Sequence, residues 1–209
     1  MAEVLKADQA GMKKAAEIVR SGGIVVLPTL TIYVLVCDAM NKDALEKLRR
    51  IRKSPADKPI TIVMDKSRID EFAVLDDRQR RIIDLFSPSP VSMYVQKKAD
   101  TPLDSAAAGS DALVVYFQDS PVRDLYEESG LILAITSSNL KGLPDAMNIQ
   151  EAVAYFGDEV DLYLDGGPAG GSNPSPHIGI RVRPVRSRRE AVHFPFSKIL
   201  EILARHGLE

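Results

Sequence analysis

Two short apolar runs around a hydroxyl-rich turn decide the fold, and they lie in residues 22–36, with the sequence GGIVVLPTLTIYVLV. The run Ile24–Leu27 is short and β-branched, and a proline ends it, a pattern typical of a buried strand. The segment Thr31–Val36 predicts a second strand or extended segment. Because Thr29 lies in the turn before it, hydroxyl groups are expected at the point where the two segments meet.

Helices are expected on both sides of these strands. Upstream, apolar residues recur at helical spacing from Met12 to Val19, and the segment Ser21–Gly23 stops that helix. Downstream, Asn41 is placed to cap a helix that runs through Arg50.

The rest of the chain repeats this mixture of short strands and helices. Strands are predicted at 60–64, 91–96, 113–117, 131–135, 160–164 and 177–183. Helices are predicted near 67–72, 77–86, 121–129 and 149–157, and a C-terminal helix at about 197–206. Strands and helices are interleaved without strict alternation, and no linker divides residues 1–209. The sequence therefore predicts one α/β domain, a twisted mixed sheet with flanking helices.

The composition excludes several classes of protein. Hydrophobic residues make up 45% of the chain and charged residues 27%, which is ordinary for a globular protein and excludes a disordered or collagen-like chain. Lys and Arg number 27 against 29 Asp and Glu, so no overall basic field indicates a nucleic-acid partner. The single cysteine, Cys37, cannot form an intramolecular disulfide. No apolar run approaches the roughly 20 residues of a membrane span, and no signal-peptide pattern begins the chain. A cytoplasmic protein with no membrane partner is expected.

Common catalytic and cofactor motifs are not found in the sequence. Neither a P-loop nor a Gly-x-Gly-x-x-Gly pattern occurs, and the glycine-rich loop 166–174 has no lysine. His177, His193 and His206 have no metal-ligand spacing, so packing or surface roles are expected for them. Ser138–Lys141 matches a Ser-x-x-Lys pattern. Only two positions of this pattern are fixed, so matches by chance are common. The sequence thus indicates no protein-side-chain metal site, no tightly bound cofactor and no certain catalytic residue.

Three polar clusters follow predicted strands or helices, where ligands bind in open α/β sheets. The first contains Thr29 and Thr31, which can contact a small polar ligand or bond the local backbone as turn residues. The second is Arg49–Pro59, a concentration of basic residues that suits a polyphosphate or carboxylate. Interaction with the helix dipole accounts for some of these cations. The third, Thr136–Asn139, either binds phosphate oxygens or caps the next segment.

A further group of arginines lies at 181–189, with no acidic residue among them. Arginines that alternate along a strand are typical of a solvated sheet edge that resists aggregation, and this interpretation is favoured. A contact with phosphate or RNA is the alternative.

Taken together and in this order, the clusters resemble the YrdC/YciO family of threonylcarbamoyl-AMP synthases over about residues 8–190. The family's Gly-Gly strand and Pro-Thr-Asp/Glu-Thr-x-Tyr-Gly-Leu motif corresponds to Gly22–Leu35. Its Lys-x-Arg-Pro motif corresponds to Arg52–Pro55, and Asp57–Pro59 follows. Its Pro-Gly-Pro-x-Thr motif corresponds to Ser87–Ser92, and its Ser-Ala-Asn motif to Ser137–Asn139.

The resemblance implies an α/β fold around a large, positively charged concave surface. Active members of the family condense L-threonine, bicarbonate and ATP, with Mg²⁺ accompanying the ATP, into threonylcarbamoyl-AMP, which is used to modify adenosine 37 of certain tRNAs. Thr29, Thr31 and Tyr33 would then shape the threonine side of the site. The residues that would hold the nucleotide phosphates are Arg52, Lys58, Ser137, Asn139 and Ser175.

The chain departs from the family pattern at several motif positions, and its arginine-first variant looks more like the YciO branch. Leu30 stands in place of an acidic residue, Val34 and Val36 in place of glycines, and Ser54 and Tyr116 in place of arginines. Pro176 and Gly179 fall within a segment that keeps only the family's serine.

Three interpretations follow from these departures. The first is a synthase of threonylcarbamoyl-AMP or a related carbamoyl-adenylate. The second is a catalytically weakened paralogue that binds nucleotide or double-stranded RNA. The third is an enzyme of the same fold that adenylates or carbamoylates another substrate.

Overall fold

The computed structural model describes residues 2–117, 120–171, 174–192 and 194–209. The strands of the described residues are β1 Glu3–Lys6, β2 Val25–Pro28, β3 Tyr33–Asp38, β4 Thr61–Val63, β5 Ala73–Val74, β6 Ser92–Lys97, β7 Ala112–Tyr116, β8 Leu133–Ser137, β9 Leu162–Asp165, β10 His177–Gly179 and β11 Arg186–Arg189. The α-helices are α1 Gln9–Arg20, α2 Lys42–Arg52, α3 Ile69–Phe72, α4 Asp77–Leu85, α5 Asp104–Ala107, α6 Pro121–Ser129, α7 Ile149–Phe156 and α8 Phe196–Arg205. Two short 3₁₀ helices lie at Lys66–Arg68 and Gly157–Glu159.

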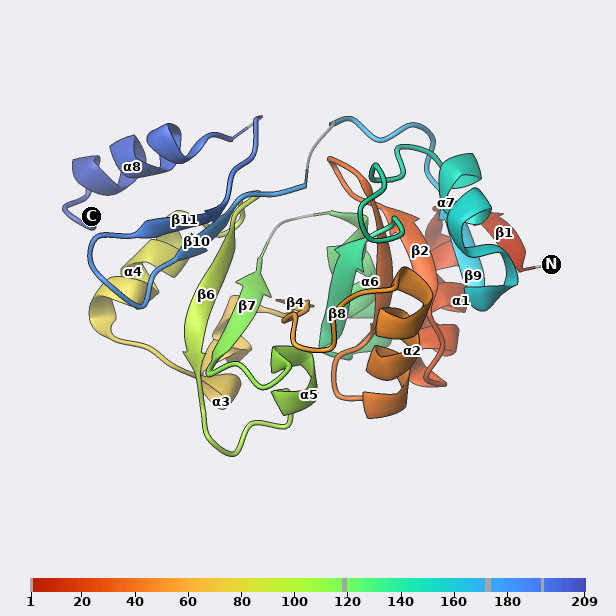
Figure 1. Ribbon diagram of the computed structural model, residues 1–209, viewed down its shortest axis with the longest axis horizontal. Helices are drawn as coiled ribbons and strands as arrows, with labels where there is room; N and C mark the ends of the chain where they lie inside the picture. The colour runs from red at the N-terminus through yellow and green to blue at the C-terminus, as the bar shows by residue number, and fades with distance from the viewer. Residues whose placement is uncertain (1, 118–119, 172–173, 193) are drawn as a thin grey trace.

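The described strands form one mixed sheet, in the order β1-β9-β2-β3-β8-β4-β7-β6-β10-β11, with β5 paired to β6. Parallel pairs such as β4 with β7 and antiparallel pairs such as β3 with β8 occur side by side. Figure 1 shows β1 at the end of the molecule that holds the N-terminus, and β10, β11 and α8 at the end that holds the C-terminus. The predicted single α/β domain with a mixed sheet and flanking helices is confirmed.

The sheet separates two hydrophobic cores. In β3, Tyr33, Leu35 and Cys37 point into the larger core, to which α2, α4, α5, α7 and α8 contribute. Val34 and Val36 point to the other face, where α1 and α6 pack against each other. Because both faces are covered, the central strands are apolar along most of their length rather than alternately polar.

Local chemistry explains where several elements begin and end. The Asn41 side chain accepts a hydrogen bond from the backbone N–H of Ala44, so it caps α2 as predicted. Lys53 ends this helix in the left-handed conformation, with φ of 55°, which is uncommon for a residue other than glycine. Arg52, the last residue of α2, is buried.

The C-terminal part differs from its prediction in one respect. The strand expected at 177–183 ends at Gly179, and a separate strand, β11, pairs with it in the antiparallel direction. A proline at position 184 has no N–H to give to a ladder, which suits the turn between the two strands. The short elements β1, β5 and α5 were not predicted either, since each spans only two to four residues. None of the described helices combines the length and the apolar character that a transmembrane span needs.

Replacing Leu35 by alanine is expected to lower the free energy of unfolding by about 2–5 kcal/mol, because the side chain is fully buried and its loss leaves a cavity. Leu30, which is 57% exposed, provides a matched control, and Leu30→Ala is expected to change that free energy by no more than about 0.5 kcal/mol. Urea denaturation followed by circular dichroism measures both variants. Equal losses in the two would contradict the burial of β3.

Candidate functional site

A cavity of about 90 Å³, open to solvent, lies on the sheet face that carries α1 and α6. Strand residues of its lining, among them Val34, Tyr116 and Ile135, belong to the smaller core. Loops and the end of α2 complete the walls. Of the residues predicted for ligand binding, six line the cavity: Thr29, Thr31, Arg52, Lys58, Ser137 and Ser175. Tyr33 and Asn139 do not line it.

The Arg52 guanidinium is held at the end of α2 by a set of hydrogen bonds. Its Nε donates to the Ser137 carbonyl at 3.0 Å, and its Nη2 donates to the Ser137 hydroxyl at 2.8 Å. Its Nη1 donates to the Ser54 hydroxyl at 3.0 Å. Burial lowers the pKa of Arg52, and the nearby Asp145 carboxylate opposes that effect. The hydrogen bonds thus fix the guanidinium in position through neutral oxygen atoms of Ser54 and Ser137.

Asn139 acts on the cavity through Arg52. Its Oδ1 accepts from Arg52 Nη2 at 2.8 Å and from the Ser137 hydroxyl at 2.9 Å. Its Nδ2 donates to the Leu143 carbonyl. In this structure Asn139 therefore orients the arginine, while Ser137 faces the cavity beside it.

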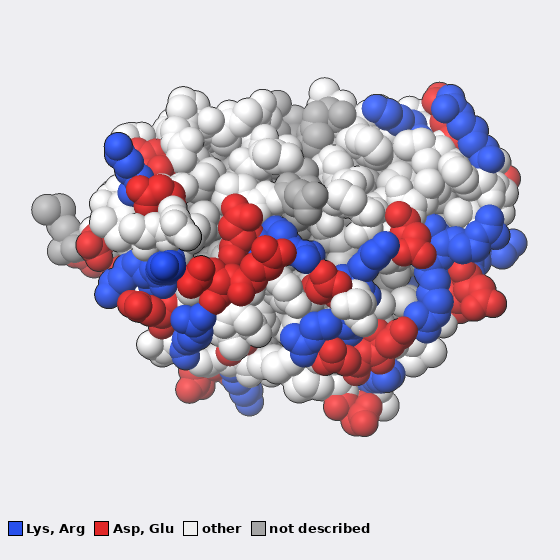
Figure 2. All heavy atoms as spheres, turned by 180° about the vertical axis from the view of Figure 1, so that it is seen from behind, with Lys and Arg blue, Asp and Glu red and all other residues white. Residues whose placement is uncertain are grey.

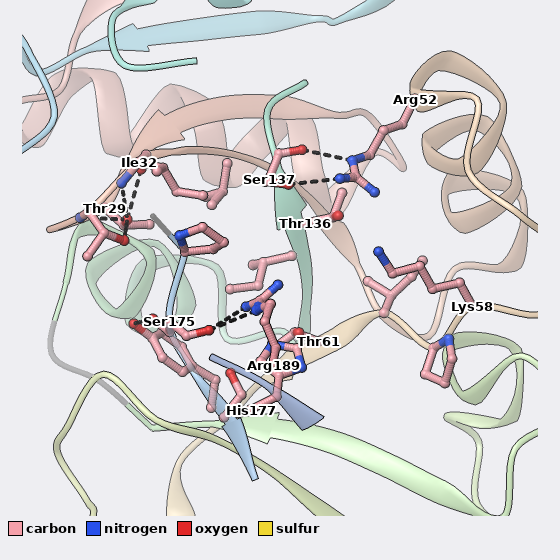
Figure 3. A pocket seen from close by; sticks show the side chains of 18 residues that line it. Thr29, Ile32, Arg52, Lys58, Thr61, Thr136, Ser137, Ser175, His177 and Arg189 are labelled. Atoms are coloured by element: carbon pink, nitrogen blue, oxygen red, sulfur yellow. Dashed lines mark hydrogen bonds between the residues drawn. The ribbon is translucent and has the colours of Figure 1, made fainter. Parts of the chain in front are cut away.

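Three cations, Arg52, Lys58 and Arg189, line the cavity together (Figure 3). Burial lowers the pKa of Lys58, and the charges of Arg52 and Arg189 lower it further. Within the described part of the chain, none of the three forms an ion pair with a carboxylate. Cations that repel one another without a paired acid favour an anionic ligand. The positively charged concavity that the resemblance implies is present here.

Arg189 comes from β11, on the other side of the cavity from Arg52. Its Nε and Nη2 both donate to the Ser175 carbonyl, at 2.9 and 2.6 Å, as Figure 3 shows. The Ser175 hydroxyl in turn lies 3.2 Å from the Tyr116 hydroxyl. Burial raises the pKa of Tyr116 to about 12, so its phenol is neutral at physiological pH.

The turn of residues 29–32 is closed by the Thr29 hydroxyl. Its Oγ1 accepts from the backbone N–H groups of Thr31 and Ile32, both at 3.2 Å, and donates to the Ile32 carbonyl at 2.8 Å. Thr29 therefore bonds the local backbone as a turn residue, and both threonines also line the cavity.

Tyr33 supports the cavity from behind. Its side chain is fully buried in the larger core, and its hydroxyl donates to the Gly167 carbonyl at 2.7 Å. The same hydroxyl accepts from the Gly166 N–H at 3.1 Å. Tyr33 thus ties β3 to the glycine-rich loop.

The departures from the family pattern lie in different places. Val34 lines the cavity, whereas Val36 is fully buried in the core beneath and does not. Leu30 is exposed. Ser54 accepts a hydrogen bond from Arg52, and Tyr116 lines the cavity as a neutral group.

Thr136, from the third polar cluster, also lines the cavity, and several lining residues were not named as site residues, among them Thr61, Ser92, His177 and Arg189. The sequence did not place residues 186–189 on a strand, but in β11 adjacent residues point to opposite faces of the sheet, so Arg188 and Arg189 lie on different faces. In β11, residues 186 and 188 are exposed, and residues 187 and 189 are half-buried. The solvated-edge interpretation of the arginine group therefore fits the exposed members and not Arg189.

His206 and Arg181 do not line the cavity. His206 is exposed just after α8, and His193 lies outside the described residues. Arg181 forms an ion pair with Asp111 at 2.6 Å. In the described residues, no group of three or more His, Cys, Asp or Glu side chains could hold a metal ion. On the face seen in Figure 2, basic and acidic side chains are intermingled, so the described charges there do not form a large patch of one sign.

Replacing Tyr33 by phenylalanine is expected to lower the free energy of unfolding by about 1–3 kcal/mol, because the Gly166 N–H and the Gly167 carbonyl lose their partner. Tyr155→Phe is the control, since its hydroxyl bonds the Pro144 carbonyl in an exposed setting where water can replace it. Denaturant unfolding measures both. A loss no larger than that of the control would show that this tie is dispensable.

Comparisons with known proteins agree on one family. The family model Sua5_yciO_yrdC, described as telomere recombination, matches residues 17–191. A threonylcarbamoyl-AMP synthase of Idiomarina loihiensis is 32% identical over 73% of this chain and 84% of its own length.

Solved structures share the fold. Escherichia coli YciO superposes with a TM-score of 0.82 at 24% identity, covering 92% of this chain and 97% of that one. Sua5 of P. abyssi complexed with L-threonine gives a TM-score of 0.88 at 21% identity, and the match covers 97% of this chain and 61% of the Sua5 chain. This chain therefore spans less than two thirds of Sua5. This chain belongs to the Sua5/YciO/YrdC family.

Proposed function

We propose that this protein binds ATP, with its Mg²⁺, in the cavity and forms threonylcarbamoyl-AMP from L-threonine, bicarbonate and ATP. The observation that carries the proposal is the convergence of Arg52, Lys58 and Arg189 on one cavity without a paired carboxylate in the described residues. A polyphosphate supplies the negative charge that this arrangement lacks.

The chemistry asks mainly for alignment and charge neutralisation. Bicarbonate takes up a proton and loses water to give carbon dioxide, to which the threonine amine adds with loss of a proton to form a carbamate. A carbamate oxygen then attacks the α-phosphorus of ATP, and pyrophosphate leaves. Arg52, Lys58 and Ser137 would hold phosphate oxygens, and Ser175 would contact the ligand from the opposite side. Thr29 and Thr31 would border the threonine and its carbamate. The product would serve the modification of adenosine 37 in tRNA.

The relatives support this assignment. The Idiomarina loihiensis relative is a threonylcarbamoyl-AMP synthase, and the P. abyssi Sua5 structure is a complex with L-threonine. The Sua5 structure also shares the fold that, in this chain, brings the three cations around the cavity.

Replacing Arg52 by alanine is expected to weaken ATP binding at least tenfold and to abolish threonine-dependent release of pyrophosphate. Each hydrogen bond to a charged group contributes about 1.5–3 kcal/mol, and about 1.4 kcal/mol is a tenfold change in affinity. Isothermal titration calorimetry and a coupled pyrophosphate assay measure the two effects.

Arg50→Ala is the matched control for this experiment. Arg50 lies on the same helix but does not line the cavity, and its ion pair with Glu159 is exposed. Release of pyrophosphate that does not depend on threonine, or equal binding by both variants, would contradict the proposal.

A second candidate function is nucleotide binding without turnover. Val34 occupies part of the cavity wall where the family has glycine, and the neutral Tyr116 and Ser54 stand where it has arginine. Action on another substrate is a further candidate that these same substitutions support.

Double-stranded RNA binding would rest on the exposed Arg183, Arg186 and Arg188, and an affinity that falls steeply with salt would support it.

Under this second candidate, ATP raises the melting temperature of the wild-type protein without release of pyrophosphate. Val34→Gly is then expected to restore measurable release, because it removes the side chain that narrows the cavity. Val36→Gly is the matched control on the same strand and face, since Val36 does not line the cavity. Threonine-dependent release by the wild-type protein would contradict this candidate.

A further inference from the structure

Strand register places four side chains of the cavity in one row. Tyr116 of β7 pairs with Ser92 of β6, Ser92 pairs with His177 of β10, and His177 pairs with Arg189 of β11. All four residues line the cavity. The row therefore crosses four strands and presents two hydroxyls, an imidazole and a guanidinium to the same space.

The imidazole of His177 has an unused polar atom. Its Nε2 is buried and has no hydrogen-bond partner in the described structure. The Tyr94 ring lies beside it, with 5.9 Å between the ring centroids and an angle of 60°. Buried polar atoms in native proteins nearly always have a partner, so an unpartnered atom in the lining of a cavity is available to a ligand or to a water molecule that the ligand displaces.

The charges around His177 select the kind of ligand. Burial, and then the charges of Arg189 and Lys58, lower the pKa of this histidine well below its ordinary value, so the ring is neutral at physiological pH. A neutral imidazole carries one N–H donor and one acceptor nitrogen. The two neighbouring cations repel a ligand ammonium group and attract an anionic oxygen, to which an Nε2–H can donate.

We propose that His177 is a ligand-binding residue of the cavity, and that its Nε2–H donates a hydrogen bond to a phosphate oxygen of the bound ligand. The inference rests on the proposed function, because the phosphate is that of the nucleotide. It adds a neutral donor beside Arg189 on the wall opposite Arg52 and Ser137. A phosphate oxygen placed there is neutralised by Arg189 and Lys58 and oriented by His177.

The test compares His177→Val with His177→Gln by calorimetric titration with pyrophosphate and, separately, with ATP. The valine variant has no donor and is expected to bind both about tenfold more weakly than the wild type. The glutamine variant keeps an N–H donor and is expected to bind within about threefold of the wild type. His206→Val is the matched control, because His206 is exposed and does not line the cavity.

Stability gives a second readout. Without ligand, His177→Val is expected to raise the melting temperature by about 2–4 °C. The substitution removes from β10 a buried nitrogen, Nε2, that has no hydrogen-bond partner in the described residues. A higher melting temperature together with unchanged affinity would assign His177 a packing role and overturn the inference.

The outcomes separate this inference from the proposed function. If the wild-type protein binds neither pyrophosphate nor ATP, the proposed function fails and the inference fails with it. If the wild type binds both, Arg52→Ala binds weakly and His177→Val binds normally, the inference alone fails. Weaker binding of L-threonine, with pyrophosphate binding unchanged, would overturn the assignment to phosphate.

An NMR measurement on the wild-type protein covers the case in which the valine variant does not fold. The Cε1–Hε1 signal of His177, identified by its loss in His177→Gln, is expected to shift on addition of pyrophosphate while that of His206 stays in place. A His177 signal that does not move would overturn the inference.

Discussion

The buried guanidinium of Arg52 is the constraint on which the rest of the site depends. A cation that leaves water needs hydrogen-bond partners, and here these are the end of β8, Ser54 and the Asn139 amide. These contacts join the end of α2 to the centre of the sheet. The left-handed turn at Lys53, where the next loop begins, lies directly after Arg52. Ser137, which binds Arg52, lines the cavity wall at the same place.

The three cations of the cavity lower the stability of the folded protein and favour the binding of an anion. Burial lowers the pKa of Arg52, Lys58 and Arg189, and the charge of Arg52 lowers the pKa of the other two further. Asp145 acts on all three from a distance and offsets part of this cost, although no described carboxylate is paired with them. An anion that binds among them relieves the repulsion, so binding is expected to stabilise the folded state by mass action.

Local patterns predicted most of the fold and only part of the site. The cap at Asn41 and the helix 121–129 follow from neighbouring residues, and the structure has both. The direction of a side chain depends on register between distant strands, which no local pattern contains. That is why Tyr33 lies behind the cavity, Asn139 acts through Arg52, and His177 and Arg189 enter the lining.

The two walls of the cavity come from opposite ends of the chain. Thr29, Arg52 and Lys58 lie in its first third, whereas Ser175, His177 and Arg189 lie in its last fifth. During synthesis from the N-terminus, the first wall is made long before the second. The cluster of cations is therefore completed only when β10 and β11 pair with the edge of the sheet, and that pairing adds the repulsion between Arg189 and the two cations of the first wall.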